Sequence, residues 1–186
     1  SLQAICDIDE QRALEVSEEL QVPHCFTDFA DMLALDALDA VVIVSPSDYH
    51  VEHIKMALEA RKHVFCEKPL STSIDVCKEA EEIVEAHPDQ HFMLGFMRRY
   101  DPSYQEAKER IEAGEIGRPV LFRAYSQDPM TGIEGALRFS PTSGGVFFDM
   151  AVHDIDLARW LLGVDPVLVH SIGGNYVEPG FAEFND

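Results

Sequence analysis

The stretch DAVVIVSPSDYH, residues 39–50, carries the clearest indication of fold in this chain of 186 residues. Its first half is a continuous run of mostly β-branched residues, which is typical of a parallel strand buried on both faces. Residues 50–58 then repeat apolar side chains at helical spacing, and Ser47 is placed to cap that helix. The pattern predicts one strand–helix unit of a parallel sheet.

The segments on both sides repeat this alternation. We expect strands at residues 2–6, 63–66 and 91–96. We expect one helix at residues 10–20, a second short helix that Thr27 caps, and a third from Ser71 or Ser73 to residue 86. Strands that alternate with crossover helices form a parallel α/β sheet. Residues 1–97 are therefore expected to form one α/β domain.

The alternation breaks at residues 98–100, and the spacing of elements changes. The sequence then predicts a helix at 102–113, a strand at 119–126, a loop rich in Gly, Ser and Pro at 131–145, a helix at 149–162 that Gly163 ends, and a strand at 167–176. We therefore expect a domain boundary near residues 95–101 and a second domain at residues 98–186.

The charge of the chain is strongly acidic, because 34 Asp and Glu residues stand against 14 Lys and Arg, a net charge of −20. Such a surface repels nucleic acids and anionic membranes, so we expect neither as a partner. The longest aliphatic run, residues 40–44, is too short to span a bilayer, and no signal peptide is recognisable. The four cysteines form no CxxC pair, which favours free thiols in a reducing cytoplasm.

Asp7 ends the first expected strand. In dinucleotide-binding folds an acid at this place binds the adenosine ribose through its hydroxyls, although Asp there also suits an ordinary turn. Because the next residue is Ile8 and not a cation, a 2′-phosphate would meet an unpaired carboxylate, which favours NAD over NADP.

Ser45 and Pro46 follow the strand at 39–44, at the carboxyl end where open α/β sheets bind ligands. His50 and His53 form an HxxH on the next helix. That spacing can hold a metal ion, but two histidines without a placed carboxylate are more typical of packing or surface positions. We therefore assign no metal site.

Glu67-Lys68-Pro69 also follows a strand, and the proline restrains how Lys68 is presented. A lysine in a cleft beside a cationic nicotinamide can exchange protons with a hydroxyl, whereas the alternative is a turn with a surface lysine.

Asp149, His153 and Asp156 are spaced i, i+4 and i+7, so they share one helix face. An aspartate one turn from a histidine can orient the imidazole as a general base. The alternatives are a helix cap beside a packed histidine, or a carboxylate–histidine metal site that needs more ligands than this stretch contains.

A family resemblance follows from the order of these segments: Asp7, SPSDYH (45–50), EKPL (67–70), GFMRRYDP (95–102), GEIGRP (114–119) and SGGVFFDMAVHDIDLARWLLG (143–163). Together they resemble the Gfo/Idh/MocA oxidoreductases, and within that family the inositol 2-dehydrogenases, along essentially the whole chain. The resemblance implies an incomplete Rossmann-type parallel sheet that binds NAD, followed by an incomplete α/β domain with a mainly antiparallel open sheet, often used for oligomerisation. The implied activity moves a hydride from a secondary hydroxyl of a cyclitol or sugar to NAD.

The resemblance also implies roles for individual residues. His153 is the base that removes the hydroxyl proton, Lys68 contacts substrate and nicotinamide and relays the proton, and Asp149 orients the substrate or the histidine. Met97 and Arg98 lie beside the substrate. The residues implied to bind the cofactor are Asp7, Ser45, Pro46, His50, Glu67 and Lys68.

Two departures from the family pattern accompany the resemblance. The Gly-rich phosphate-binding turn and the end of the second sheet are absent from these residues, as expected for an internal stretch of a longer enzyme. Residues 126–129 are Ser-Gln-Asp-Pro where inositol dehydrogenases tend to carry a His-Arg-Asn-Pro-like segment, which leaves the polyol open. Two other function classes stay open: a non-catalytic relative that senses a nucleotide or sugar, and a metal-dependent sugar hydrolase or isomerase that uses His50, His53, Asp149 and His153.

Overall fold

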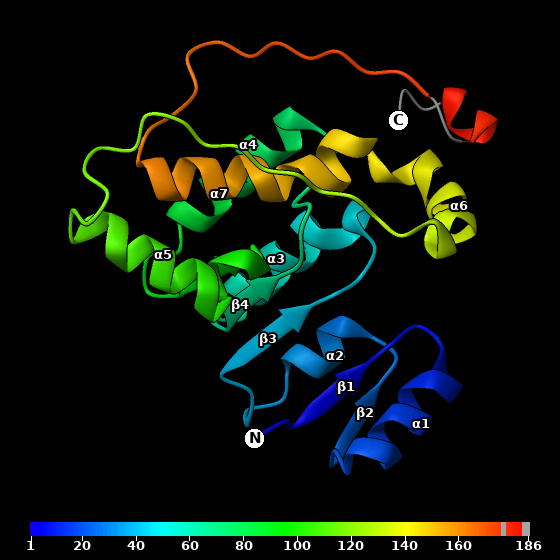
Figure 1. Cartoon of the computed structure of the whole chain (residues 1–186). Helices are drawn as coiled ribbons and strands as arrows, with labels where there is room; N and C mark the ends of the chain where they lie inside the picture. Colours follow the sequence, from blue (N-terminus) through cyan, green and yellow to red (C-terminus); the bar gives the residue numbers. More distant parts are fainter. Residues whose placement is uncertain (176–177, 184–186) are drawn as a thin grey trace. The chain divides into compact units, whose positions relative to one another are not determined.

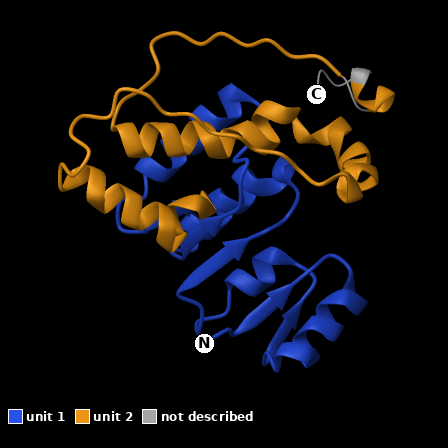
Figure 2. Cartoon of the chain, viewed as in Figure 1, with its two compact units in different colours: residues 1–95 blue, residues 96–186 orange. Residues whose placement is uncertain are grey.

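Two short parallel sheets and the helices between their strands make up the first 95 residues in a computed structural model of the chain (Figure 1). The structure describes residues 1–175 and 178–183. Its internal contacts divide the chain into two units, Ser1–Gly95 and Phe96–Asp186 (Figure 2).

The strands of the first unit all pair in parallel. One sheet joins β1 (Ala4–Cys6) to β2 (His24–Phe26), and the other has the order β3 (Ala40–Ile43), β4 (His63–Cys66), β5 (Phe92–Leu94). The helices between them are α1 (Glu10–Leu20), α2 (Phe29–Leu33), α3 (His50–Glu59) and α4 (Ile74–Glu85). The predicted α/β class is confirmed, and β2, too short for its periodicity to be detected, is the strand that the prediction missed.

Polar side chains set the starts of these helices, as helix N-termini require. The predicted bounds of α1 are confirmed, and Ser73 caps α4 by accepting the backbone N–H of Val76. The predicted Thr27 cap is wrong by one residue, because the Asp28 carboxylate accepts two N–H groups of α2. The predicted Ser47 cap is also wrong: Ser47 begins a 3₁₀ turn, η1 (Ser47–Tyr49), with no side-chain cap.

A single hydrophobic core joins both sheets of the first unit. It contains Ala4 from β1, Val41 and Ile43 from β3, and Ile54 and Leu58 from α3, and the two α3 side chains are almost wholly inaccessible to solvent. Because residues from both sheets share this core, β1 and β3 belong to one folded body although they are not paired with each other.

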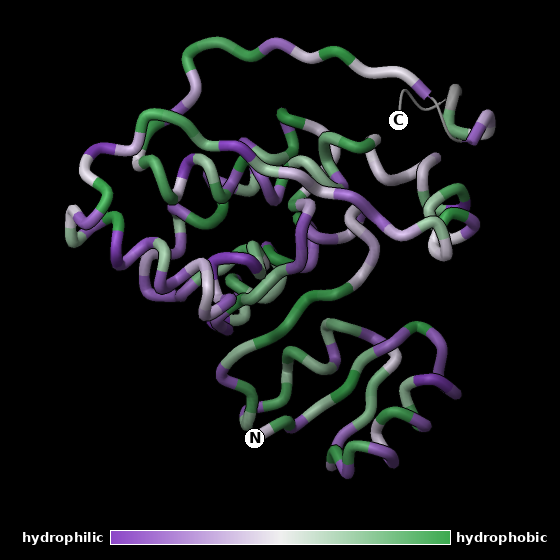
Figure 3. Tube along the Cα trace, in the orientation of Figure 1, coloured by the Kyte–Doolittle hydropathy of each residue, from purple (hydrophilic) through white to green (hydrophobic). Residues whose placement is uncertain are grey.

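Strand β3 is buried on one face only. Val41 and Ile43 are buried, whereas Val42 is 67% exposed and Val44, just beyond the strand, is 71% exposed. The expectation of a strand covered on both faces is therefore wrong. Within the described residues β3 has a neighbour on its β4 side only, which leaves one strand edge open. Figure 3 shows how hydrophobic this strand is along its length.

Helices make up the regular structure of the second unit within the described residues. They are η2 (Met97–Tyr100), α5 (Pro102–Glu112), η3 (Met130–Gly132), α6 (Ile133–Ser143), η4 (Phe147–Ala151), α7 (Val152–Leu162) and η5 (Pro179–Glu183). η4 is a π-helical turn that runs directly into α7. Gly163 ends α7 with φ 66°, a left-handed conformation that glycine adopts without a steric penalty, as predicted.

The predicted loop at residues 131–145 is wrong, because most of it forms α6. The helical spacing was hidden by serines at buried positions, where hydrophobic residues were expected. The hydroxyls of Ser140 and Ser143 donate to the backbone carbonyls of Leu137 and Ser140, at 3.0 and 3.2 Å, which lets them be buried within the helix.

The strands predicted at 119–126 and 167–176 are not formed in the described part of the chain, and neither is the antiparallel sheet that the resemblance implied. Both segments are extended and exposed, with Val120 91% and Leu168 86% accessible to solvent. A strand requires a neighbour to accept and donate its ladder bonds, and neither segment has one among the described residues; Tyr176 lies outside them. No described helix combines the length and apolar character needed to cross a membrane.

Candidate active site

Three chain segments lie at the carboxyl edge of the β3–β4–β5 sheet, and two of them contain predicted site residues. Ser45 follows β3, Glu67 and Lys68 follow β4, and Gly95 follows β5. The backbone N–H of Glu67 donates to Ile43 and that of Gly95 donates to Cys66, so the sheet pairing extends into these segments. A side chain at Gly95 would meet the Glu67 carboxylate at 3.1 Å, which shows how closely the two loops approach. The Lys68-Pro69 peptide bond is cis.

His50 joins two of these segments. The whole residue is 2% exposed, and it opens α3. Nε2 lies 2.7 Å from the Ser45 carbonyl oxygen and Nδ1 lies 2.9 Å from the Pro69 carbonyl oxygen. Both ring nitrogens of His50 therefore contact backbone carbonyls of the segments that follow β3 and β4.

His53 lies one turn further along α3, and its Nδ1 is 3.0 Å from the Ser45 hydroxyl. Its ring packs between aromatic neighbours, 4.6 Å from Phe29 and 6.0 Å from Tyr49 between ring centroids. Burial lowers the pKa of His53, the charge of Glu52 acts to raise it, and His50 acts to lower it. The HxxH pair thus has packing and hydrogen-bonding roles in the structure.

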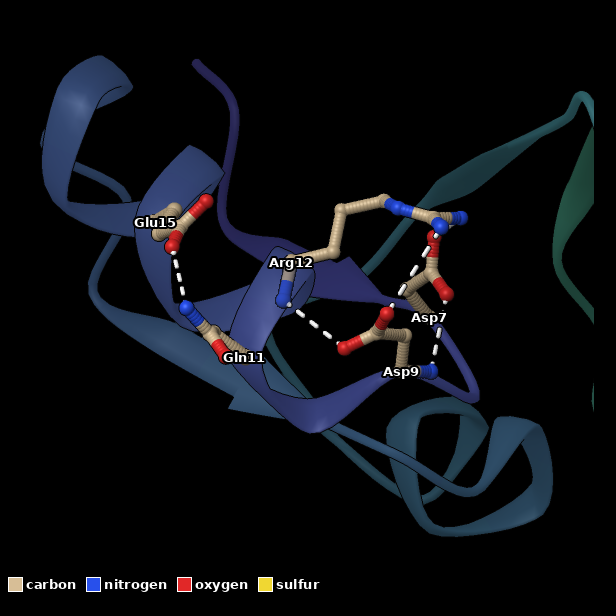
Figure 4. Close-up of polar contacts among 5 residues, drawn as sticks. All are labelled: Asp7, Asp9, Gln11, Arg12 and Glu15. Carbon is tan, nitrogen blue, oxygen red and sulfur yellow. Dashed lines mark hydrogen bonds and ion pairs between the residues drawn. The ribbon is translucent and has the colours of Figure 1, made fainter.

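Asp7 lies directly beyond β1, and its carboxylate is held on two sides (Figure 4). Oδ1 accepts the backbone N–H of Asp9 at 2.9 Å, and Oδ2 pairs with Arg12 Nη1 at 3.3 Å. Arg12 also pairs with Asp9 at 3.6 Å. The expectation that no cation accompanies Asp7 is therefore wrong, since Arg12 reaches it from the first turn of α1.

In the second unit, Asp149 lies in η4 and His153 lies in the first turn of α7. His153 is buried, and Asp149 lines a cavity of about 540 Å³ between α6, η4, the segment at 128–132, and residues 174, 175 and 181. The other polar residues at this cavity are Asp128, Ser140, Ser143 and Asn175. A volume of this size falls in the usual range of small-molecule sites. His153 is absent from the described lining, so the structure brings only Asp149 of this pair to the cavity.

Arg98, expected beside the substrate, is engaged by other residues. Its Nη1 donates to Asp154 and its Nη2 lies 3.0 Å from the Ser126 hydroxyl, which itself donates to Asp154 at 2.6 Å. The Arg98 and Asp154 side chains are only 22% and 21% exposed. Met97, its neighbour, is 64% exposed.

A second pair joins the same two elements. Arg99 donates from Nε and Nη2 to the two carboxylate oxygens of Asp156, at 2.8 and 2.5 Å, and Asp156 is 4% exposed. The Arg99 guanidinium also lies over the rings of Phe96 and Trp160. Asp154, Asp156, Arg99 and Ser126 thus anchor the helix that carries His153, and the prediction missed this role. The charge match between the twin arginines and the two aspartates was the signal that could have revealed it.

No cluster of three or more His, Cys, Asp or Glu side chains suited to a metal ion occurs in the described part of the chain. The four cysteines are free, and burial raises the pKa of the Cys66 thiol to about 12. Neither observation adds a catalytic centre to the two regions above.

The comparison with protein families decides the assignment. The family model described as an oxidoreductase family with an NAD-binding Rossmann fold matches residues 1–96, and that of the GFO/IDH/MocA C-terminal domain matches residues 104–186.

The chain belongs to the Gfo/Idh/MocA family.

Similar members of this family include the scyllo-inositol 2-dehydrogenase (NAD(+)) of Bacillus subtilis, strain 168, which is 38% identical over 94% of this chain and 50% of its own length. Apo scyllo-inositol dehydrogenase from Lactobacillus casei matches 98% of this chain and 53% of its own, with 40% identity and a TM-score of 0.91. The same enzyme with bound NAD(H) and scyllo-inositol matches 88% of this chain and 48% of its own, with 42% identity and a TM-score of 0.81. The chain thus spans about half the length of the Gfo/Idh/MocA relatives that it matches.

Proposed function

We propose that the full-length protein is an NAD-dependent dehydrogenase that oxidises a secondary hydroxyl of a cyclitol or sugar, with inositols as the first candidates. The observation that carries this proposal is the position of Glu67 and Lys68 at the carboxyl end of β4, in a parallel sheet that matches an NAD-binding Rossmann family. The similar structures, which include a scyllo-inositol dehydrogenase with bound NAD(H) and scyllo-inositol, support the choice of substrate class.

Several residues of the first unit fit a dinucleotide. Asp7 directly follows β1, where an acid accepts hydrogen bonds from the adenosine ribose hydroxyls, and its carboxylate is partly exposed. Ser45, Pro46 and Glu67 lie at the carboxyl edge of the second sheet and would flank the cofactor. NAD, when bound, supplies the hydride acceptor. The phosphate-binding Gly-x-Gly-x-x-Gly turn does not occur in these 186 residues.

The protein supplies the proton chemistry. In this proposal His153 removes the proton of the reacting hydroxyl, and its burial on α7 keeps water away from the ring. The Lys68 ammonium exchanges the proton with solvent, and Asp149 orients the substrate or the imidazole.

The assembly and location of the enzyme are part of the same proposal. Residues 1–97 would belong to the NAD-binding domain and residues 98–186 to a substrate-binding and oligomerisation domain. The free cysteines support a cytoplasmic protein, and the exposed apolar segments of the second unit support a homo-oligomer.

The experiment that tests the proposal measures NADH formation by the full-length enzyme across a panel of inositols and aldoses. We expect reduction of NAD with at least one inositol. An enzyme that binds NAD but oxidises neither inositols nor aldoses would contradict the dehydrogenase assignment and favour a sensing relative.

A further inference from the structure

Ser126, Asp154 and Arg98 form a closed ring of hydrogen bonds between three segments of the second unit. The Ser126 hydroxyl donates to Oδ2 of Asp154 at 2.6 Å and accepts from Nη2 of Arg98 at 3.0 Å. Nη1 of Arg98 donates to Oδ1 of Asp154, and both charged side chains are mostly buried. Because a hydroxyl both donates and accepts, Ser126 bonds to both partners of the ion pair at once.

The bond between Ser126 and Asp154 joins two segments that contribute to the wall of the cavity. Ser126 is two residues before Asp128, and Asp154 is four residues after Met150, and both Asp128 and Met150 line the cavity. Segment 119–126 has no strand partner among the described residues, so sheet pairing does not fix its position. The bond to Asp154 therefore supplies a fixed point for the chain that leads into the cavity wall.

Asp154 also directly follows His153, the proposed base, in the first turn of α7. Successive residues of an α-helix point about 100° apart, so a fixed Asp154 side chain fixes the rotation of this turn and with it the direction of the imidazole. The bond from Asp156 to Arg99 adds a second fixed point on the same helix. The turn before α7 is the π-helical η4, a geometry that is frequent at functional sites.

We propose that Ser126 is a positioning residue of the dehydrogenase, which acts through Asp154 to hold His153 in a fixed place relative to the cavity wall. Arg98 completes the ring and in this view supports the site instead of binding the substrate. The bond matters for the rate of each folded molecule, because a misplacement of about 1 Å can cost about 100-fold in rate. This effect on the reaction rests on the proposed function of His153.

Steady-state kinetics of the full-length enzyme test the role of the hydroxyl. We expect Ser126→Ala to lower kcat by about 10- to 100-fold, with KM for NAD nearly unchanged because Asp7 belongs to the first unit. Ser126→Thr keeps the hydroxyl and should retain most of the rate. The matched control is Ser17→Ala, which removes a partly buried hydroxyl that donates to the Val22 carbonyl at 3.1 Å and should keep kcat. Normal kcat in a folded Ser126→Ala enzyme, or equal losses in the Ala and Thr variants, would overturn the proposal.

The route through Asp154 is tested by Asp154→Ala, alone and combined with Ser126→Ala. If Ser126 acts through Asp154, the double variant is no slower than Asp154→Ala, because the effects of residues in one hydrogen-bond network do not add. Losses that multiply in the double variant would overturn this route.

The position of the imidazole also has a readout that needs no turnover. In ¹H–¹³C spectra of the histidine rings of the full-length protein, the His153 signals are assigned by their loss in His153→Ala. We expect these signals to shift in Ser126→Ala and to stay in place in Ser17→Ala. Unshifted signals in Ser126→Ala would overturn the proposal, whether or not Asp154→Ala folds. Absence of NAD-linked oxidation in the unsubstituted enzyme would instead contradict the proposed function, and the spectra would still decide whether Ser126 positions His153.

Discussion

Asp7 and Arg12 are five residues apart in sequence and in contact in the structure, at 3.3 Å. The residue after Asp7 was the natural place to look for a cation, but a helix brings its first turn back over the end of the preceding strand. Arg12 is held by two acids, Asp7 and Asp9, so the group remains acidic overall and disfavours a 2′-phosphate. The expectation of NAD over NADP is therefore kept, for a different reason.

Replacement of Asp7 by Ser should shift the preference toward NADP. The change removes a negative charge and releases Arg12, which is 65% exposed, to meet a 2′-phosphate. We expect the ratio of kcat/KM for NADP to that for NAD to rise at least about tenfold, equivalent to ~1.4 kcal/mol. The double variant Asp7→Ser with Arg12→Ala is the control. If it keeps the full shift, Arg12 has no part in the selectivity.

Lys68→Ala and His153→Ala should each lower kcat by about 10²–10⁴-fold, the usual contribution of general acid–base catalysis, while NAD binding is retained. Steady-state kinetics and calorimetry with NAD on the full-length enzyme measure the two effects. Lys78→Ala provides the control, because Lys78 is a mostly exposed residue of α4 paired with Asp75. Near-normal turnover of either site variant would refute the role assigned to that residue.

At the scale of one element, the segment of η4 and α7 contains both candidate site residues and aspartates that form structural ion pairs. Asp149, His153 and Asp156 were predicted from their spacing to share one helix face, and Asp154 lies between the last two in sequence. The structure divides them: Asp149 lines the cavity, whereas Asp154 and Asp156 bind Arg98 and Arg99. The ion pairs hold α7 to η2, the segment that opens the second unit.

Removal of Asp156 should therefore destabilise the protein. Asp156→Ala leaves the partly buried Arg99 without its carboxylate, and the loss of one partner of a buried pair lowers the free energy of unfolding by about 3 kcal/mol. Equilibrium unfolding in urea measures the change. The control is Glu134→Ala, which breaks the exposed pair with Arg138 at 3.9 Å and should change stability by less than about 1 kcal/mol. Equal effects of the two variants would show that burial does not strengthen the Asp156 pair.

Elements with strong local signals could be predicted from the sequence, and those that depend on partners could not. The α1 helix has a capping aspartate, an amphipathic spacing and a proline beyond its end, and its predicted bounds are those observed. Segment 119–126 has a β-strand composition, but composition does not provide the neighbouring strand that a ladder needs. In the candidate site, the sequence order identified Asp7, Lys68, Asp149 and His153 as candidates, whereas contacts such as Arg12 with Asp7 depend on the fold.

For the whole molecule, the Gly-rich phosphate-binding turn decides how tightly NAD can bind. A dinucleotide site needs a Gly-rich turn and a helix N-terminus for the pyrophosphate, and these residues contain no such turn. A protein of these 186 residues alone should bind NAD too weakly for calorimetry to detect and should have no dehydrogenase activity. Binding in the micromolar range would show that the turn is dispensable and that the cofactor residues are assigned wrongly.

The open edge of β3 has a consequence for colloidal stability. An unpaired strand edge with the exposed Val42 in it and Val44 beside it is a template for pairing between copies, and the net charge of −20 keeps such copies apart by mutual repulsion. The range of that repulsion shrinks from about 10 Å in 0.1 M salt to about 3 Å in 1 M salt. Light scattering of these 186 residues should therefore report particles that grow as salt is added, and Val42→Lys should suppress the growth. A particle mass independent of salt would mean that charge is not what keeps this edge unpaired.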